Sequence, residues 1–426
     1  MSTTREKILY ALPAYILAYP IIPTFVYLPT FYGETLGLGL SIVGIILLFL
    51  RVFDVITDPI IGWISDRIPK RYGKRKLPMV VGGLIGGPSL VALFSPPNNV
   101  GPLYLFIWGL LLYLSWTAIQ IPYYSWAAEL EPEYKERVKL NSYREGAGLI
   151  GVLSFLIIIF FLNDISIAES LKTISCIVLL IGSVVFFIPL KFVPQGRVTD
   201  KKEKITLPYE NKVFLRLTAA WFFNGLANGL PAVCLPLYLS YIIQVDENTK
   251  SLFILLYFLF AVLAIPLWVY LSKYMDKHKV WCLSMIFASI VFLFVPLLWT
   301  QDIIAFGIIC ILTGIALGSD LILPPSIQAD CADWDRLRYK KERTGILFSY
   351  WSMSTKLALG LAVGISFPIL EFLGLSENNL NAKIALIMIY AGIPVVLKMC
   401  AVLLMWNFPL THKKHLGIKH ALEKIK

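Results

Sequence analysis

The chain has 426 residues, of which 58% are hydrophobic and only 15% are charged, and its formal net charge is +11. Soluble domains carry roughly 25% charged residues, so this composition excludes an ordinary soluble protein and indicates one that crosses a membrane several times.

Twelve continuously apolar stretches follow one another along the chain. Each is close to the roughly 20 residues that a helix needs to cross a bilayer, and none alternates apolar and polar residues as the strands of a membrane barrel do. We therefore predict an all-α membrane protein with twelve transmembrane helices near 8–31, 41–64, 77–96, 102–127, 145–163, 172–192, 212–243, 250–272, 280–300, 303–327, 344–373 and 382–409.

The longest polar break, 191–212, separates six of these helices from the other six. Weak echoes link the halves: near the ends of helices 4 and 10, a proline precedes Glu129 or Asp330 by a few residues, and a basic cluster follows. This pattern favours a 6+6 pseudo-symmetric major facilitator fold. The predicted parts are two six-helix bundles, a linker and a basic tail, at 1–192, 212–410, 193–211 and 411–426.

Lys and Arg gather in alternate connections, and only Lys172, Lys250 and Lys383 lie in the connections on the other side. The positive-inside rule then predicts that both termini are cytoplasmic. Basic loops that face the lipid bilayer explain the net charge better than a nucleic-acid partner does. The tail histidines His412 and His415 are expected to be solvated.

The end of the second apolar stretch carries Arg51, Asp54 and Asp58, followed by Pro59. The three charges share one helix face, because they are spaced three and four residues apart. Charges at membrane depth face a protein interior or an aqueous cavity, and paired carboxylates suit a hard monovalent cation or a shared proton. A structural salt bridge of Arg51 with either acid is the alternative.

The next residues read GWISDRIPKRYGKRK, and they resemble the loop signature of the major facilitator superfamily. That resemblance implies a conformational latch, and Arg51 joins these gating residues. Gly62 is expected to allow close helix approach. A simple positive-inside loop is the alternative. The signature residues are Gly62, Asp66, Arg67, Gly73 and Arg75.

Four segments resemble the glycoside–pentoside–hexuronide:cation symporter family, typified by melibiose permease. They are RxxDxxxDPxxGxxxD (51–66), IPYYSW (121–126), NSYRE (141–145) and WSMSTK (351–356). The resemblance spans nearly the whole chain. It implies a secondary transporter that couples Na⁺ or H⁺ to a glycoside, uronide or related anionic solute. The broad family also includes sodium-dependent lysophospholipid transporters, so a lysophospholipid or another amphiphile is the alternative substrate.

The resemblance places the cation, as a bound metal ion or a proton, at Asp54 and Asp58. Gln120 stands where the family's type member has a third carboxylate, and its carbonyl oxygen can still serve the cation. Ala18 lies near the position of a sugar-binding aspartate in helix 1. These two departures count against galactoside binding in the same manner.

The resemblance also assigns substrate-binding residues. Tyr124 matches a substrate-stacking tryptophan, Arg144 an arginine near the substrate and the cytoplasmic gate, and Lys356 the helix 11 lysine near both sites. Trp126, two residues after Tyr124, is expected to face elsewhere.

Four further polar residues lie in apolar stretches of the second half. Asp320 either pairs with Lys356 or touches substrate or cation. Asn224 and Asn228, four residues apart, either line the substrate cavity or make interhelical hydrogen bonds. Lys398 is expected to snorkel or to pair.

No nucleophile–base pattern, metal motif or phosphate loop is apparent, so we expect no catalytic residue, no enzyme activity and no cofactor beyond the coupling ion. We expect a monomer in the plasma (inner) membrane, with a small-molecule substrate and a monovalent cation as partners.

Overall fold

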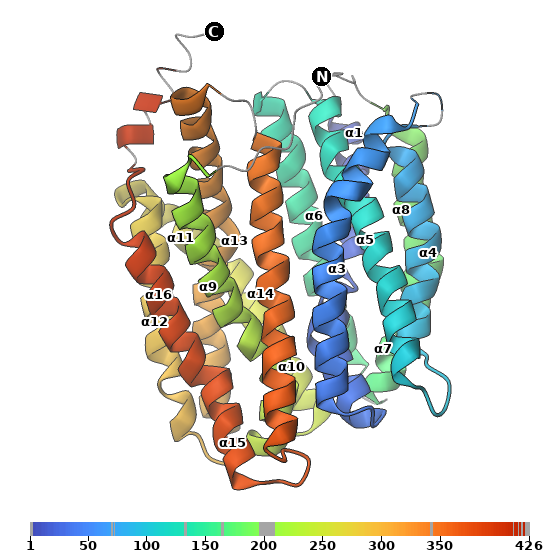
Figure 1. The fold of residues 1–426 in the computed structure, drawn as a ribbon, viewed down its shortest axis with the longest axis vertical. Coiled ribbons are helices and arrows are strands. Elements are labelled where there is room, and N and C mark those ends of the chain that lie inside the picture. The colour runs from blue at the N-terminus through green and yellow to red at the C-terminus, as the bar shows by residue number, and fades with distance from the viewer. Residues whose placement is uncertain are drawn as a thin grey trace. The chain divides into compact units, whose positions relative to one another are not determined.

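The computed structural model describes residues 3–69, 71, 73–131, 134–162, 166–195, 209–340, 344–411, 413–415, 417–418 and 421, and helices are the regular structure in these ranges (Figure 1). Twelve of its helical segments are long and apolar enough to cross a membrane, from Thr4–Thr35 to Leu380–Met405. The predicted all-α architecture with twelve spans is therefore confirmed.

The chain forms two compact units. The first comprises Met1–Lys201 together with Val363–Phe372, the last turns of α14. Its helices are α1 (Thr4–Ala18), α2 (Leu28–Thr30), α3 (Leu40–Arg67), α4 (Lys76–Phe94), α5 (Pro102–Leu130), α6 (Tyr134–Phe161), α7 (Ile167–Ile177) and α8 (Ser183–Phe192).

The second unit comprises Lys202–Ala362 and Leu373–Lys426. Its helices are α9 (Lys212–Tyr238), α10 (Glu247–Leu263), α11 (Ile265–Tyr274), α12 (Lys277–Phe292), α13 (Ile303–Tyr339), α14 (Thr344–Phe372, up to Ala362), α15 (Leu380–Ile387) and α16 (Ile393–Met405).

The first span of each unit ends in an irregular turn. In the first unit, two π-helical turns, Pro23–Tyr27 and Phe31–Thr35, flank α2, and in the second unit α9 passes into the π-helical turn Leu239–Ile243. Proline removes a backbone donor, and membrane helices accommodate this by local π adjustments. Both spans are 32 residues long. The prolines of the two halves therefore lie in the corresponding first span of each unit.

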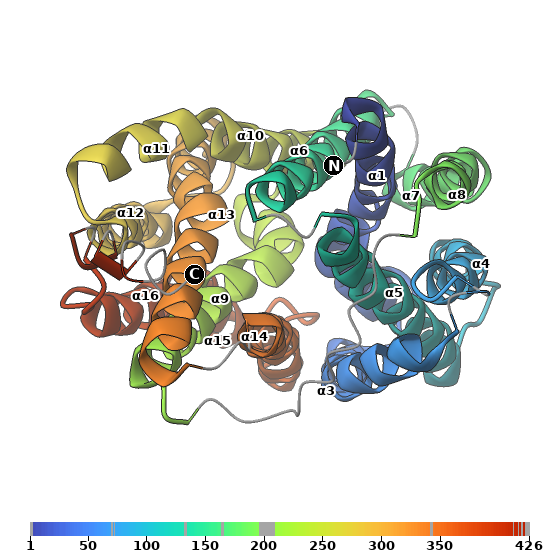
Figure 2. The same ribbon diagram turned by 90° about the horizontal axis from the view of Figure 1, so that it is seen from above.

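In the second unit, α13 packs against α9, α10, α11 and α12 (Figure 2). Two glycines allow its close approach to α10, because a Cβ atom on Gly314 would lie 2.3 Å from Tyr257 O and one on Gly318 would lie 2.4 Å from Ala261 O. Small residues at such crossings let membrane helices pack through their backbones. This contact fixes the position of Asp320, two residues after Gly318.

In the first unit, α5 packs against both α3 and α4, and α1 packs against α6 and α8 (Figure 2). The helix α5 therefore has one face toward α3, which carries Asp54 and Asp58. Its second half supplies side chains to two neighbouring polar groups, described next.

Candidate functional site

The two aspartates of α3 lie together with one hydroxyl group of α5. Thr117 Oγ1 is 2.6 Å from Asp54 Oδ1 and 3.1 Å from Asp58 Oδ1, with the hydroxyl as donor. Asp54 is 1% exposed and Thr117 is fully buried. The predicted pair of carboxylates is thus joined by a third oxygen group, which the sequence interpretation missed.

Arg51 contacts this group loosely. Its Nη1 is 3.5 Å from Asp54 Oδ2, which is longer than the 2.7–2.9 Å of a tight charge-assisted hydrogen bond. The guanidinium carbon lies 4.1 Å from the ring centre of Phe25 and 4.3 Å from that of Tyr113. Two aromatic rings therefore hold Arg51 beside the carboxylates.

We call Arg51, Asp54, Asp58 and Thr117 the carboxylate group. It brings two acids, one arginine and one hydroxyl together, with Asp54 buried and Asp58 partly exposed. Carboxylate and hydroxyl oxygens are the ligands that hard cations prefer.

Gln120 belongs to the neighbouring cluster in this structure. Its amide nitrogen donates a hydrogen bond of 2.8 Å to the hydroxyl oxygen of Tyr124. Tyr113, Thr117, Gln120 and Tyr124 are spaced four, three and four residues apart, so they form one polar stripe along α5. This spacing is the sequence signal that could have identified Thr117.

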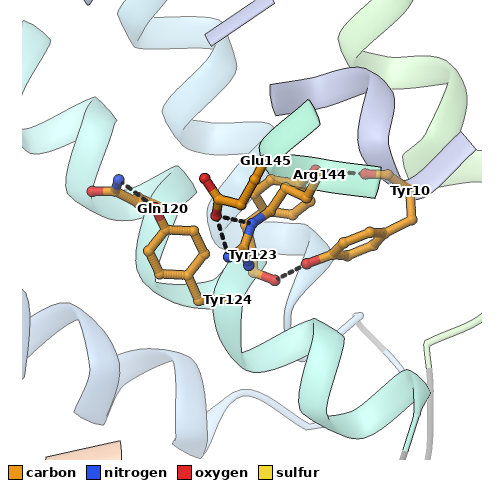
Figure 3. A network of polar contacts seen from close by, with 6 residues as sticks. All are labelled: Tyr10, Gln120, Tyr123, Tyr124, Arg144 and Glu145. Atoms are coloured by element: carbon orange, nitrogen blue, oxygen red, sulfur yellow. Dashed lines mark hydrogen bonds and ion pairs between the residues drawn. The ribbon is translucent and has the colours of Figure 1, made fainter. Parts of the chain in front are cut away.

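Arg144 of α6 lies over the ring of Tyr124, with 4.3 Å from the guanidinium carbon to the ring centre (Figure 3). Its Nη2 and Nε are 2.7 and 3.2 Å from Oε1 of Glu145. The side chain of Glu145 is 68% exposed and that of Arg144 only 13%. We call Gln120, Tyr124, Arg144 and Glu145 the arginine group; it presents a cation, a ring and a hydroxyl as binding groups.

Two buried tyrosines support the arginine group from α1 and α5. Tyr10 donates to the backbone oxygen of Tyr123 at 2.8 Å, and Tyr123 donates to the backbone oxygen of Tyr10 (Figure 3). Trp126 faces elsewhere, as expected: it is fully buried, and its indole nitrogen donates to Pro194 O at 2.8 Å.

The predicted gating residue Arg75 joins the ends of three helices. Its Nη2 is 2.8 Å from Oε1 of Glu129 on α5, and its Nη1 donates to Ser65 Oγ on α3 at 2.9 Å. Gly73, two residues earlier, has a φ of +80°, which side-chain-bearing residues rarely adopt.

The other signature residues are placed differently. Arg67 lies 3.6 Å over the ring of Trp63. A Cβ atom on Gly62 would meet Ile121 at 3.6 Å, an ordinary contact, so the space around this position does not itself require a glycine. The side chain of Asp66 lies outside the described residues.

In the second unit, Asp320 accepts three hydrogen bonds. Asn224 Nδ2 and Asn228 Nδ2 donate to its Oδ2 at 3.0 and 2.7 Å, and Trp281 Nε1 donates to its Oδ1 at 2.6 Å. Lys398 donates to the amide oxygens of Asn224 and Asn228 at 3.0 and 2.7 Å. Both amides therefore bridge an acid to a lysine, and we call these five residues the amide-bridged network.

The structure decides between the alternatives for the two asparagines and for Lys398. Asn224 and Asn228 make interhelical hydrogen bonds, and Lys398 is paired rather than snorkelling. Lys356 of α14, the other partner considered for Asp320, is 8% exposed. The hydrogen-bond donors to the Asp320 carboxylate described above are Asn224, Asn228 and Trp281. Nearby, Trp221 and Trp351 stack at 4.4 Å between ring centres.

Comparison with known proteins gives a match over almost the whole chain. The profile of a family described as MFS/sugar transport protein matches residues 9–412. The sodium-dependent lysophosphatidylcholine symporter 1 of Mus musculus is 22% identical over 440 residues, which cover 90% of this chain and 81% of that protein. The isoprimeverose transporter of Lactiplantibacillus pentosus is 24% identical over 407 residues, which cover 89% and 83%.

A solved structure shares the fold. The crystal structure of a bacterial homologue of the human lysosomal transporter Spinster, inward-facing and occupied, superposes with a TM-score of 0.66 at 13% identity. The match covers 96% of this chain and 97% of that one. The predicted major facilitator fold is confirmed.

Proposed function

Because the chain belongs to the family of MFS/sugar transport proteins, we propose that it is a symporter in which a monovalent cation, Na⁺ or H⁺, drives the uptake of a small anionic solute. The cation binds at Asp54 and Asp58 with the Thr117 hydroxyl, and the anionic group of the solute binds at Arg144 beside Tyr124. The two halves of the bundle then expose the loaded protein to alternate sides of the membrane.

The polar stripe on α5 carries this proposal, because it supplies both groups. Seven residues separate Thr117 from Tyr124, which is about 10 Å along a helix. Two opposite unit charges about 10 Å apart attract by about 1.7 kcal/mol at an effective dielectric constant of 20. A bound cation would therefore raise the affinity for the anion roughly 15-fold, and the coupling is reciprocal.

Glu145 supports an anionic substrate. It is the carboxylate that contacts Arg144, it is well exposed, and it follows Arg144 directly in the chain. A substrate carboxylate, uronate or phosphate offers the same oxygens and would take its place as a bidentate partner of the guanidinium. Tyr124 would stack against a sugar ring or an apolar portion.

An apolar cavity favours a second candidate, a lysophospholipid or another amphiphile. About 560 Å³ of empty space, part of it open to the surface, lies among α1, α4, α5 and α8. Its walls include Leu17, Leu90, Trp116 and Phe186, and no residue of the carboxylate or arginine group lines it. The alkyl chain of an amphiphile would fit such walls, with its phosphate at Arg144.

Thermal unfolding of the purified protein in detergent tests the proposal. We expect Na⁺ to raise the midpoint relative to choline chloride of equal ionic strength, because a ligand of the folded state stabilises it. The Asp58→Asn variant should lose this shift, and Asp246→Asn, which removes an exposed carboxylate of the second unit, should retain it. A full Na⁺ response in Asp58→Asn would contradict the assignment.

The same assay separates the two substrate classes. Glycosides, hexuronides and lysophosphatidylcholine are each added with and without Na⁺. A shift with a hexuronide that grows in Na⁺ supports the solute symporter, whereas a shift with lysophosphatidylcholine alone supports the second candidate. Uptake into vesicles, driven by a Na⁺ or H⁺ gradient, then identifies the coupling ion.

The placement of both termini in the cytoplasm, in a plasma (inner) membrane, is part of the proposal and rests on the bias of Lys and Arg between connections. A fluorescent protein that matures only in the cytoplasm, fused after Lys426, should fluoresce. Fluorescence restricted to exported reporters would reverse the orientation.

A further inference from the structure

The segment that follows α16 belongs to the second unit and carries a further group of charged side chains. A helical turn begins at Thr411, whose backbone oxygen accepts from His415 N at 3.0 Å. His415 and Ile418 are three residues apart and share one helix face. They are 8% and 4% exposed, so the expectation of a solvated His415 is wrong, while His412 lies outside the described residues.

His415 reaches two acids of α13. Its Nε2 is 3.3 Å from Asp330 Oδ1 and 3.2 Å from Asp333 Oδ2. Lys277 at the start of α12 lies 2.7 Å from Asp330 Oδ2. Ionised carboxylates only accept hydrogen bonds, so Nε2 must carry a hydrogen in this arrangement.

Among the residues that the structure describes, the charged groups beside the imidazole are Asp330 and Asp333 of α13, and Lys277 of α12 is paired with Asp330. On the segment of His415 itself, Lys413 and Lys414 are exposed. The two acids and Lys277 sum to −1, and a protonated His415 brings the sum to zero. Protonation also places a positive charge on the donor ring, so the contacts with the two carboxylates become ion pairs.

We propose that His415, Asp330, Asp333 and Lys277 form a proton-binding site, and that proton uptake there holds the C-terminal segment against the second unit. Imidazole changes its charge between about pH 5 and 8. The segment is therefore held tightly at low pH and loosens as the pH rises. Its apolar anchors Phe408 and Leu410, which are 2% and 8% exposed, keep it in place near its start.

This site does not depend on the proposed transport function. If the termini are cytoplasmic, it responds to the pH of the cytoplasm, and the segment that it controls lies at the end of the unit where α9 and α12 begin. The acid of the neighbouring turn, Asp335, accepts instead from Asn211 Nδ2 at 2.9 Å, so loosening the segment leaves that contact in place.

Thiol accessibility in the full-length protein tests the proposal. Ile418→Cys places a thiol on the buried face, and Gly417→Cys places one on the exposed face beside it. Both are labelled with a maleimide from pH 5.5 to 8.5, and labelling is read site by site from peptide masses. The ratio of the two rates cancels the pH dependence of thiol chemistry, and we expect it to rise about fivefold with pH.

Three histidine variants sharpen the result. His415→Gln should give a high ratio at every pH, and His415→Lys, a permanent cation, should give a low one throughout. His278→Gln removes another buried histidine of the second unit and should keep the pH dependence. A ratio that stays flat in the parent, or equal responses of parent and His415→Gln, would overturn the proposal. So would protection that requires added Zn²⁺ and disappears with a chelator, because the ligand would then be a metal.

Discussion

Each unit buries carboxylates and a cation among its helices, but the charge balance differs. In the first unit, two aspartates stand against one arginine, which lies between two rings and 3.5 Å from the nearer acid. In the second unit, one aspartate and one lysine are linked through two amides with bonds of 2.7–3.0 Å. Among the residues named, the first group has two acids to one cation, and the second has one acid and one cation.

This difference provides a criterion for distinguishing a binding site from a structural network among charged residues in a membrane. Polar groups at membrane depth are by default functional candidates. A network whose acid and lysine are already joined by hydrogen bonds is explained as a structural contact, whereas two carboxylates around one hydroxyl offer oxygen ligands to a cation. We therefore interpret the amide-bridged network as a structural tie among α9, α12, α13 and α16.

The largest effect is expected from Asp320→Asn, because it leaves Lys398 buried without its counter-charge. Breaking a buried pair costs about 3–5 kcal/mol, and for a chain of this size that lowers the unfolding midpoint by roughly 3–6 °C. The double variant Asp320→Asn with Lys398→Met should recover much of the loss. Differential scanning fluorimetry without Na⁺ measures both, and an unchanged midpoint in the single variant would remove the distinction between the units.

A smaller effect is expected from Thr117→Val, which removes one hydroxyl of the carboxylate group and keeps its shape. Hydrogen bonds to charged groups contribute about 1.5–3 kcal/mol, so Na⁺ affinity should fall by at least about tenfold. Thr117→Ser keeps the hydroxyl and serves as the control. Isothermal titration with Na⁺ gives the affinities, and equal values for the valine and serine variants would exclude Thr117 from the cation site.

The smallest effect is expected from Glu145→Gln, since the carboxylate is exposed. Exposed ion pairs contribute about 0.2–1 kcal/mol, so removing this competitor for Arg144 should raise the affinity for an anionic ligand by about twofold to fivefold. Neutral ligands should bind unchanged. Glu169→Gln removes another exposed acid of the same unit and should have no effect. Weaker binding of anions by Glu145→Gln would mean that Glu145 helps to hold them.

The sequence predicted the spans because they depend on the length of apolar runs, and it predicted the face that carries Asp54 and Asp58 because that face depends on local spacing. Arg75 and Glu129 could also be singled out from the sequence, although the ion pair between them could not be predicted. Such bonds depend on how far each helix is rotated about its axis. A helix that is apolar all round gives no periodic pattern from which that rotation can be derived.

Three interaction partners therefore could not be predicted from the sequence. Trp281 donates to Asp320, yet a lone tryptophan in an apolar span is more often an interfacial anchor. Glu145 forms an ion pair with Arg144, although consecutive residues on a helix do not normally face each other. His415 is buried by the fold of a short segment that has few local signals. In contrast, Thr117 could have been predicted, because the spacing of the polar residues on α5 shows that they share one helix face.

A single hydrogen atom on Thr117 makes the proposed cation site asymmetric. It can point to only one of two acceptors at a time, and the shorter distance assigns it to Asp54. The two acids are therefore unequal as hydrogen-bond acceptors, although they lie about one helical turn apart on the same face of α3.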